Sequence, residues 1–234
     1  YFIEESTKYI FISFLIYFVT NYLSQDFGQI RQGLANAICL IALDNLLHKK
    51  NWVFTGLVLI ATSFHYSAAV FFIVPFIINL NVNWYKMAGV WVLCFLIGRS
   101  LSQFSYLFLL LDIRSDSVFS NKLSYIENEQ YNAGVTFSLG MVFKLLILIV
   151  SSIVLNRTEG ENKTHIGKFV NIYFTGGCLY FILGFTEIYA SRISIYFTFI
   201  EIILIPFIFS SFREPVFKIL VFLFYLAFAI LMLY

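Results

Sequence analysis

The sequence predicts an all-α fold, a polytopic bundle of about nine transmembrane helices, on two observations. Hydrophobic residues make up 60% of the chain and its mean hydropathy is +0.85, whereas ordinary soluble domains hold roughly 45 to 50% apolar residues. Charged residues make up 12% and lie in short clusters between long runs rich in Phe, Ile and Leu. Because lipid offers the backbone no hydrogen-bond partners, those runs are predicted to be helices, which satisfy their own backbone groups.

Nine apolar runs approach the roughly 20 residues that a spanning helix needs. A tenth, Leu101 to Leu111, is too short. The stretch Trp52 to Leu80 is either one long tilted helix or two helices broken at Phe64 and His65. Two helices are preferred, because one long helix would force the short tenth run to cross. The nine are Tyr9 to Leu23, Ile30 to Leu47, Trp52 to Ser63, Tyr66 to Leu80, Trp84 to Gly98, Phe137 to Leu155, Phe169 to Thr186, Ile193 to Ser210 and Val216 to Tyr234.

Residues 1–234 are predicted to form a single transmembrane domain, because they contain no repeat, low-complexity tract or proline-rich linker. The chain begins at Tyr1, and further helices are expected to precede it. Its three cysteines, Cys39, Cys94 and Cys178, lie inside apolar runs without metal-ligand spacing and are predicted to be free core thiols. No metal site and no nucleic-acid partner are predicted.

The positions of Lys and Arg predict which helix ends face the cytoplasm. With the turn at Lys49 and Lys50 inside, nine Lys and Arg residues fall on the cytoplasmic side, and seven of them are lysines. Guanidinium groups grip phosphate through paired hydrogen bonds, so an arginine-rich outer side indicates an anionic ligand there. Snorkelling or local ion pairs are the alternative explanation. The outer residues are Arg31, Arg99, Arg114, Lys122 and Arg192.

The outer loop before the second predicted helix combines a helix start with polar side chains. Backbone amides at a helix N-terminus, with Arg31 in the first turn, favour an anion. Asp26, Gln29 and Gln32 are predicted to contact the ligand, and Gln29 and Gln32 share one helix face. The alternative is a packed helix start in which Arg31 pairs with Asp26.

His65 lies at the predicted turn between two apolar runs, among the small residues of the segment Ala61 to Ala68. The other two histidines fall in predicted cytoplasmic loops. An imidazole with a pKa near 6.5 can accept a proton from a sugar hydroxyl or donate one to a leaving oxygen. A purely structural histidine is the alternative.

A third outer helix start brings Tyr189, Arg192 and Tyr196 onto one face, just after Glu187. Aromatic rings beside a cation suit a sugar attached to a phosphate. Tyrosine is equally what an interfacial aromatic belt contains.

Two ionisable residues, Lys144 and Glu201, lie inside predicted helices. Each is roughly 10 to 12 Å from the outer end of its helix at 1.5 Å per residue, which predicts a buried ion pair. The longest exterior loop, residues 112–136, is predicted to be a lid or a sugar-binding loop.

Three short motifs, between about Tyr17 and Pro206, resemble the EpsG family of Wzy-like polysaccharide polymerases, in the family's order. One departure is Ser191, where Ala or Glu is expected before the arginine. The motifs are Ile30-Arg31-Gln32-Gly33-Leu34-Ala35 for the family's Arg-Gln-Gly-hydrophobic-Ala helix start, Ile60-Ala61-Thr62-Ser63-Phe64-His65-Tyr66-Ser67-Ala68 for its Ala-x-x-Phe-His-x-Ser-Ala turn, and Ala190-Ser191-Arg192-Ile193-Ser194-Ile195-Tyr196-Phe197 for its Arg-Ile-x-x-Tyr-Phe element.

The resemblance implies a multi-pass enzyme of the bacterial plasma membrane that joins oligosaccharide repeat units carried on undecaprenyl pyrophosphate, at the outer face and without metal, nucleotide or other cofactor. Arg31 and Arg192 would hold and neutralise the pyrophosphate leaving group, and His65 would act on the acceptor hydroxyl. Arg99 and Arg114 would be secondary phosphate or sugar contacts. Membrane lipid, a chain-length regulator and a flippase of the same pathway would be partners.

Two other functions fit parts of this pattern. A ligase that moves a finished glycan from the same carrier would use similar arginines. A transporter or flippase would place basic side chains at several depths and would break helices in corresponding halves. The arginines here gather on one predicted side, and Lys144 is the single deep cation in the sequence, which disfavours transport.

Overall fold

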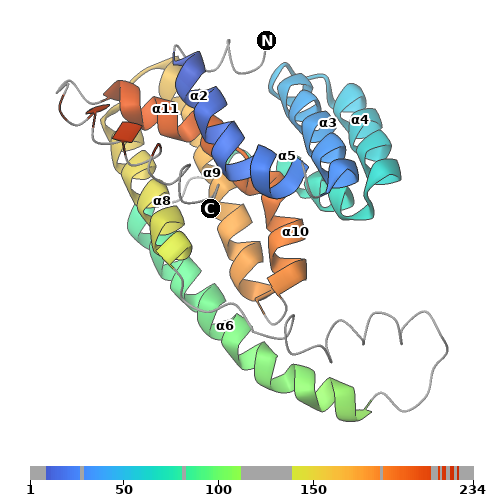
Figure 1. Ribbon diagram of the computed structural model, residues 1–234. Helices are drawn as coiled ribbons and strands as arrows, with labels where there is room; N and C mark the ends of the chain where they lie inside the picture. Colours follow the sequence, from blue (N-terminus) through green and yellow to red (C-terminus); the bar gives the residue numbers. More distant parts are fainter. Residues whose placement is uncertain are drawn as a thin grey trace.

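The computed structural model describes residues 9–26, 29–80, 83–111, 139–184 and 187–211, together with residues 216, 218, 219, 222, 223 and 226. Every regular element within these residues is a helix, which confirms the all-α prediction (Figure 1). In chain order the elements are α2 Ile10–Tyr17, the π-helix η1 Phe18–Asp26, α3 Ile30–Leu47, α4 Asn51–Phe64, the 3-10 helix η2 Tyr66–Ile73, α5 Val74–Ile77, α6 Trp84–Leu111, α8 Leu139–Arg157, α9 Glu161–Ile182, α10 Glu187–Thr198 and α11 Glu201–Ser211.

No helix in the described part of the chain is both long and apolar enough to cross a membrane alone. One pair of segments, Ala190–Thr198 and Glu201–Ser211, meets that requirement together, with a bend of 47° between them. The number of spanning helices therefore stays a prediction.

The predicted break at His65 is confirmed. α4 ends at Phe64, and His65 adopts an extended backbone with φ −149° and ψ 114°. The ring of Phe54, near the start of α4, lies 6.2 Å from that of Phe71, near the end of η2. The chain therefore reverses direction at His65, and Trp52 to Leu80 holds separate helical segments.

Three predicted helix boundaries were wrong. α6 runs on through Gly98 to Leu111, because no proline or left-handed residue interrupts it, so the separate run Leu101 to Leu111 does not exist. α9 begins at Glu161 rather than Phe169, directly after the left-handed Gly160 (φ 74°).

The predicted helix Ile193 to Ser210 was also wrong, because the chain bends between α10 and α11. At the bend the amide of Ile200 reaches only the carbonyl of Phe197, at 3.5 Å. Two other predicted features, the loop 112–136 and most of the helix Val216 to Tyr234, lie outside the described residues.

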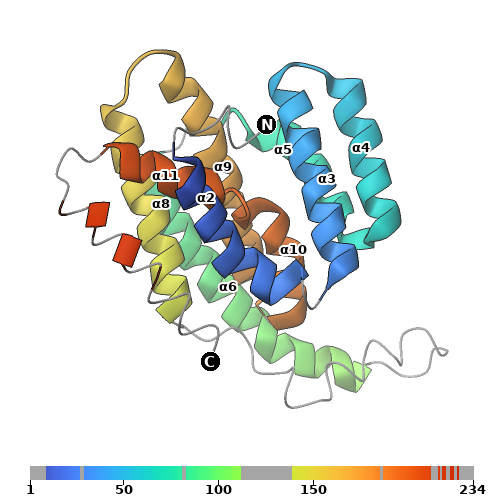
Figure 2. The same cartoon turned by 45° about the horizontal axis from the view of Figure 1, so that its top comes forward.

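α9 packs closely against α6 and α10, as Figures 1 and 2 show. Trp91 of α6 donates from Nε1 to the carbonyl of Phe174 at 2.8 Å. Gly177 leaves room for the Trp91 indole, because a Cβ at this position would overlap the ring. On the α10 side, a Cβ on Gly176 would lie 2.7 Å from Cβ of Phe197. Small residues therefore let α9 approach two neighbours.

The contact between Gly176 and Phe197 also sets the register of α9 and α10. Gly176 lies level with Phe197, and the short connection between the two helices makes them antiparallel. Arg192, five residues before Phe197, therefore lies level with about Phe181, near the C-terminal end of α9. α3 and α4 form a second antiparallel pair at one edge of the molecule (Figure 2).

The predicted ion pair between Lys144 and Glu201 is absent from the part of the chain that the structure describes. Glu201 is buried and accepts a hydrogen bond from the Tyr173 hydroxyl at 3.0 Å. That hydroxyl also lies 3.3 Å from the carbonyl oxygen of Lys144, while the Lys144 ammonium lies over the Tyr180 ring, 5.6 Å from its centroid. Glu201 and the Lys144 ammonium therefore have aromatic partners in direct contact, and no described salt bridge joins them.

The three cysteines are free, as predicted: Cys39 and Cys94 are buried and Cys178 is half-buried. One hydrophobic core extends from α2 to α11 through the described helices, with Tyr173, Phe169 and Leu148 among its fully buried side chains.

Candidate functional site

A cavity of about 690 Å³ lies where the start of α3, the end of α4 and α10 meet. It brings together the three residues predicted to be catalytic. Arg31 comes from the first turn of α3, His65 from the turn after α4, and Arg192 from α10. We call this cavity the arginine pocket.

Gln32 joins α3 to α10 beneath this pocket. Its side chain is 1% exposed, and its Nε2 donates to the main-chain carbonyl of Arg192 at 2.9 Å. Because Arg31 is the preceding residue, this hydrogen bond sets the two arginines beside the same cavity.

The acceptor side of the Gln32 amide is not satisfied by the described residues. Its Oε1 is buried without a hydrogen-bond partner among them, as is Oδ1 of Asn36, one helical turn further along α3. A buried acceptor left unpaired costs about 1–3 kcal/mol. Gln32 lines the pocket, so a hydroxyl group of a ligand or an ordered water suits this position.

His65 is held by a hydrogen-bonded group on its Nδ1 side. Nδ1 lies 2.6 Å from Oγ of Ser67, and Ser67 donates to the hydroxyl of Tyr196 at 3.2 Å. The Tyr196 hydroxyl is itself 3.4 Å from Nδ1, and the imidazole stacks on Tyr66 with ring centroids 5.3 Å apart. With Nδ1 engaged, Nε2 is the nitrogen left for a ligand.

Two effects lower the pKa of His65 below its usual value near 6.5. Partial burial disfavours the charged imidazolium, and the Arg192 guanidinium repels it. The imidazole is therefore neutral at pH 7 and keeps a lone pair.

The arginine pocket is electropositive. Arg31 is exposed and Arg192 half-buried, and no carboxylate is among the described residues that line the cavity. The N-terminus of α3 adds the positive end of a helix dipole. Two guanidinium groups beside a neutral imidazole can bind a phosphate and accept a proton next to it.

The remaining predicted ligand contacts have different outcomes. Gln29 and Gln32 line the pocket, and their contact with a ligand stays a prediction. Tyr196 is 2% exposed and reaches the site through Ser67 and His65 rather than by lining the cavity. Arg99 is exposed on α6 and is not part of the lining.

Four predicted contacts cannot be placed at side-chain level. Asp26, Glu187 and Tyr189 belong to described helices, but their side chains lie outside the description. Arg114 lies outside the described residues altogether. The alternative in which Arg31 pairs with Asp26 therefore stays open.

Sequence reasoning missed several residues of this site. Ser67 was quoted in a motif but was given no role, although it is the closest partner of His65. Thr62, Ser63, Phe64 and Tyr66 line the cavity as well. The signal was the hydroxyl two residues after the histidine, but only the extended backbone at His65 turns that hydroxyl back onto Nδ1.

Comparison with known proteins places the chain in a family. The sequence model of the EpsG family matches residues 1–234, the whole chain. Neither the curated proteins nor the solved structures gave a match. The motifs that carry the family resemblance are those that supply Arg31, His65 and Arg192 to one cavity, and the chain belongs to the EpsG family of membrane proteins.

Proposed function

We propose that this protein is a polytopic glycosyltransferase of the bacterial plasma membrane that polymerises oligosaccharide repeat units carried on a lipid pyrophosphate, at the outer face. One observation carries the proposal: Arg31, His65 and Arg192, from three separate segments, line a single cavity. Membership of the EpsG family supports it.

Large apolar side chains on the outside of the bundle support the membrane part of the proposal. Phe11 is 91% exposed, Trp52 90% and Phe76 82%. In water each such side chain would forgo about 1.5–3 kcal/mol of burial free energy, whereas acyl chains would cover it at no such cost. The bent pair α10 and α11 would form one of the spans.

The reaction makes one bond and breaks one. The acceptor hydroxyl oxygen bonds to the anomeric carbon of the donor sugar, and the bond from that carbon to the phosphate oxygen breaks. The hydroxyl proton passes to Nε2 of His65, and the lipid pyrophosphate leaves with one more negative charge. Arg31 and Arg192 stabilise that charge as it develops, because preorganised donors favour the transition state over the substrate.

The group around His65 supports its role as the base. In the tautomer that carries its hydrogen on Nδ1, the imidazole donates to Ser67, which donates to Tyr196, and the lone pair resides on Nε2. Ser67 and Tyr196 are both buried, so water does not compete for this chain of hydrogen bonds. The exposed rings of Tyr66 and Phe64 beside His65 offer apolar faces for a sugar.

The substrate in this proposal is an oligosaccharide on undecaprenyl pyrophosphate, with a chain-length regulator and a flippase of the same pathway as partners. A lipid-linked substrate suits a cavity beside lipid-facing helices. Its pyrophosphate matches two guanidinium groups, since each can form paired hydrogen bonds to phosphate oxygens.

The test replaces Arg31→Gln, His65→Gln and Arg192→Gln one at a time in the full-length protein and follows glycan chain length at equal protein level. Each variant is expected to lose polymer while lipid-linked single repeats still reach the outer face. Arg157→Gln, an exposed arginine at the end of α8, is the matched control for loss of charge and is expected to keep wild-type chain lengths.

Other outcomes have definite meanings. Wild-type chain lengths in all three variants would reject the proposed site. Repeats trapped on the cytoplasmic side would assign the pocket to transport. Loss of transfer to a separate acceptor, with polymer intact, would assign it to a ligase.

A further inference from the structure

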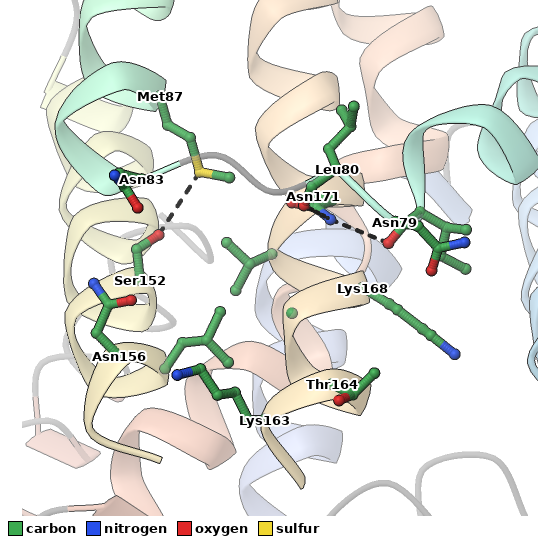
Figure 3. A pocket seen from close by; sticks show the side chains of 14 residues that line it. Asn79, Leu80, Asn83, Met87, Ser152, Asn156, Lys163, Thr164, Lys168 and Asn171 are labelled. Carbon is green, nitrogen blue, oxygen red and sulfur yellow. Dashed lines mark hydrogen bonds between the residues drawn. The ribbon is translucent and has the colours of Figure 1, made fainter. Parts of the chain in front are cut away.

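A second cavity, of about 550 Å³, lies where the turn after α5 and the start of α6 meet the end of α8 and the start of α9. Figure 3 shows its polar side chains. Two lysines and four asparagines line it: Lys163, Lys168, Asn79, Asn83, Asn156 and Asn171. We call it the lysine pocket.

The lysine pocket lies far from the arginine pocket. Arg192 is level with about Phe181 of α9, whereas the lysine pocket surrounds Gly167 of the same helix. These positions are about 21 Å apart along the helix at 1.5 Å per residue. The two cavities therefore lie toward opposite ends of the bundle, and predicted topology puts the lysine pocket on the cytoplasmic side.

The charge of this cavity is positive and unbalanced. Its described lining contains two lysines and no carboxylate. Figure 3 shows Lys163 leaving α9 toward the α8 side and Lys168 toward the side of Asn79. Lys163 is exposed and Lys168 half-buried. Figure 3 shows their ammonium groups on opposite sides of α9, with that of Lys163 on the side of α8, where an anion in the cavity can reach it.

The floor of the lysine pocket is preformed. Asn171 is 4% exposed, and its amide donates to the carbonyl of Ile78 at 3.1 Å and to that of Leu80 at 2.8 Å. These bonds hold the turn after α5 against α9. Ser152 of α8, also buried, directs its hydroxyl to Sδ of Met87 at 3.9 Å, which joins α8 to α6.

The lining selects for a compact phosphate rather than a nucleotide. No aromatic ring is among the described lining residues, so a base would find nothing to stack on. The rim offers amides and a hydroxyl from Asn79, Asn156 and Thr164, which suit the oxygens of a phosphate ester. Ile78 and Val170 provide an adjacent apolar wall.

We propose that the lysine pocket binds the phosphate group of an anionic lipid of the cytoplasmic leaflet, such as phosphatidylglycerol. Lysine suits this ligand, because its flexible side chain carries a compact charge that can follow a mobile phosphodiester headgroup. The planar guanidinium of arginine instead fixes the direction of its hydrogen bonds. The site is separate from glycosyl transfer, but its place in the cytoplasmic leaflet rests on the membrane topology of the proposed function.

The test compares the purified full-length wild type with the double variant Lys163→Gln/Lys168→Gln. The matched control is Lys49→Gln/Lys50→Gln, which removes the same charge from exposed lysines at the turn between α3 and α4. Each protein is placed in phosphatidylcholine nanodiscs with and without phosphatidylglycerol, and retained lipid is counted by native mass spectrometry. A second arm adds soluble glycerol phosphate to lipid-depleted protein in detergent and measures thermal stability.

Wild type and control are expected to retain phosphatidylglycerol, and the pocket variant to bind it roughly 30-fold less tightly, since each lysine near an anionic surface contributes about fivefold. If glycerol phosphate stabilises the wild type as much as phosphatidylglycerol does, and Lys163→Gln/Lys168→Gln loses this stabilisation, the phosphate site is supported and its ligand is a soluble ester. Equal retention by the pocket variant and wild type, or equal loss in the control, would overturn the proposal.

Discussion

The arginine pocket and the lysine pocket each hold two cations, yet they use them differently. Arg31 and Arg192 stand beside a histidine whose Nδ1 is engaged by hydroxyl groups. Lys163 and Lys168 stand among asparagines with no titratable neighbour in the described lining. Guanidinium gives direction and paired hydrogen bonds, whereas ammonium gives a point charge. The difference fits the two proposals, chemistry on a phosphate ester in the arginine pocket and retention of a phosphate in the lysine pocket.

Each pocket also contains one buried amide that binds main chain from another segment. Gln32 donates to the carbonyl of Arg192, and Asn171 donates to those of Ile78 and Leu80. Both hydrogen bonds donated by Asn171 go to main-chain carbonyls, so its role is structural. Gln32 lines its cavity and retains a buried acceptor oxygen without a partner among the described residues.

The largest expected difference between the two pockets comes from exchanging arginine for lysine in one and lysine for arginine in the other. Arg192→Lys keeps the charge but removes the guanidinium fork, so polymer formation is expected to fall about 100-fold. Lys163→Arg keeps a charge where direction matters little, and lipid retention is expected to stay within about twofold. Chain-length analysis and native mass spectrometry measure the two effects. Full activity of Arg192→Lys would show that the arginine pocket does not need a guanidinium group.

Overpacking α9 should damage both pockets at once, because this helix joins them. Gly177→Ala places a methyl group on the buried Trp91 ring and is expected to cost about 3 kcal/mol of unfolding free energy. Gly56→Ala is the control, since nothing lies within 4 Å of its Cβ position, and should gain up to about 1 kcal/mol from helix propensity. Thermal denaturation in detergent gives both values; loss confined to one pocket would show that α9 does not couple them.

The two buried amides should separate structure from function. Asn171→Ala loses two hydrogen bonds and is expected to cost about 1–3 kcal/mol of stability, with catalysis per folded molecule unchanged. Gln32→Ala loses one bond and is expected to cost about 1 kcal/mol, yet to lower polymer formation more than its folded fraction explains. Stability and activity measured on the same preparations decide between these results.

Acid should distinguish the pockets by a smaller effect. Activity is expected to fall as pH drops through the pKa of His65, which burial and Arg192 hold below about 6.5, because the protonated imidazole has no lone pair. Arg192→Gln removes a repelling cation, so the pKa of His65 should rise; NMR titration of the imidazole measures it. Lipid retention should not fall with this profile: no histidine is among the described residues lining the lysine pocket, and protonation of His165, whose pKa burial and Lys168 lower, would add positive charge beside it. An unchanged His65 pKa in Arg192→Gln would contradict the inferred proximity.

Part of the site was predictable because it rests on local patterns. Phe64-His65-Tyr66 interrupts two apolar runs, and the break occurs there. Arg31 and Arg192 each lie in a short motif near a helix start, and both line the cavity with His65. The role of Ser67 and the unpaired oxygen of Gln32 were not predictable, since both depend on where α10 lies relative to α3 and η2.

Composition and apolar periodicity by themselves determined an all-α protein with its arginines separated from its lysines. Tertiary structure alone decided that Gly98 of α6 packs against the carbonyl of Phe181, and that the Tyr173 hydroxyl lies between the main-chain carbonyl of Lys144 and the carboxylate of Glu201. It also decided that asparagines from four segments line the lysine pocket. The physical reason is that the apolar periodicity of a helix is visible in its sequence, whereas the hydrogen-bond partner of a polar group depends on how helices pack together.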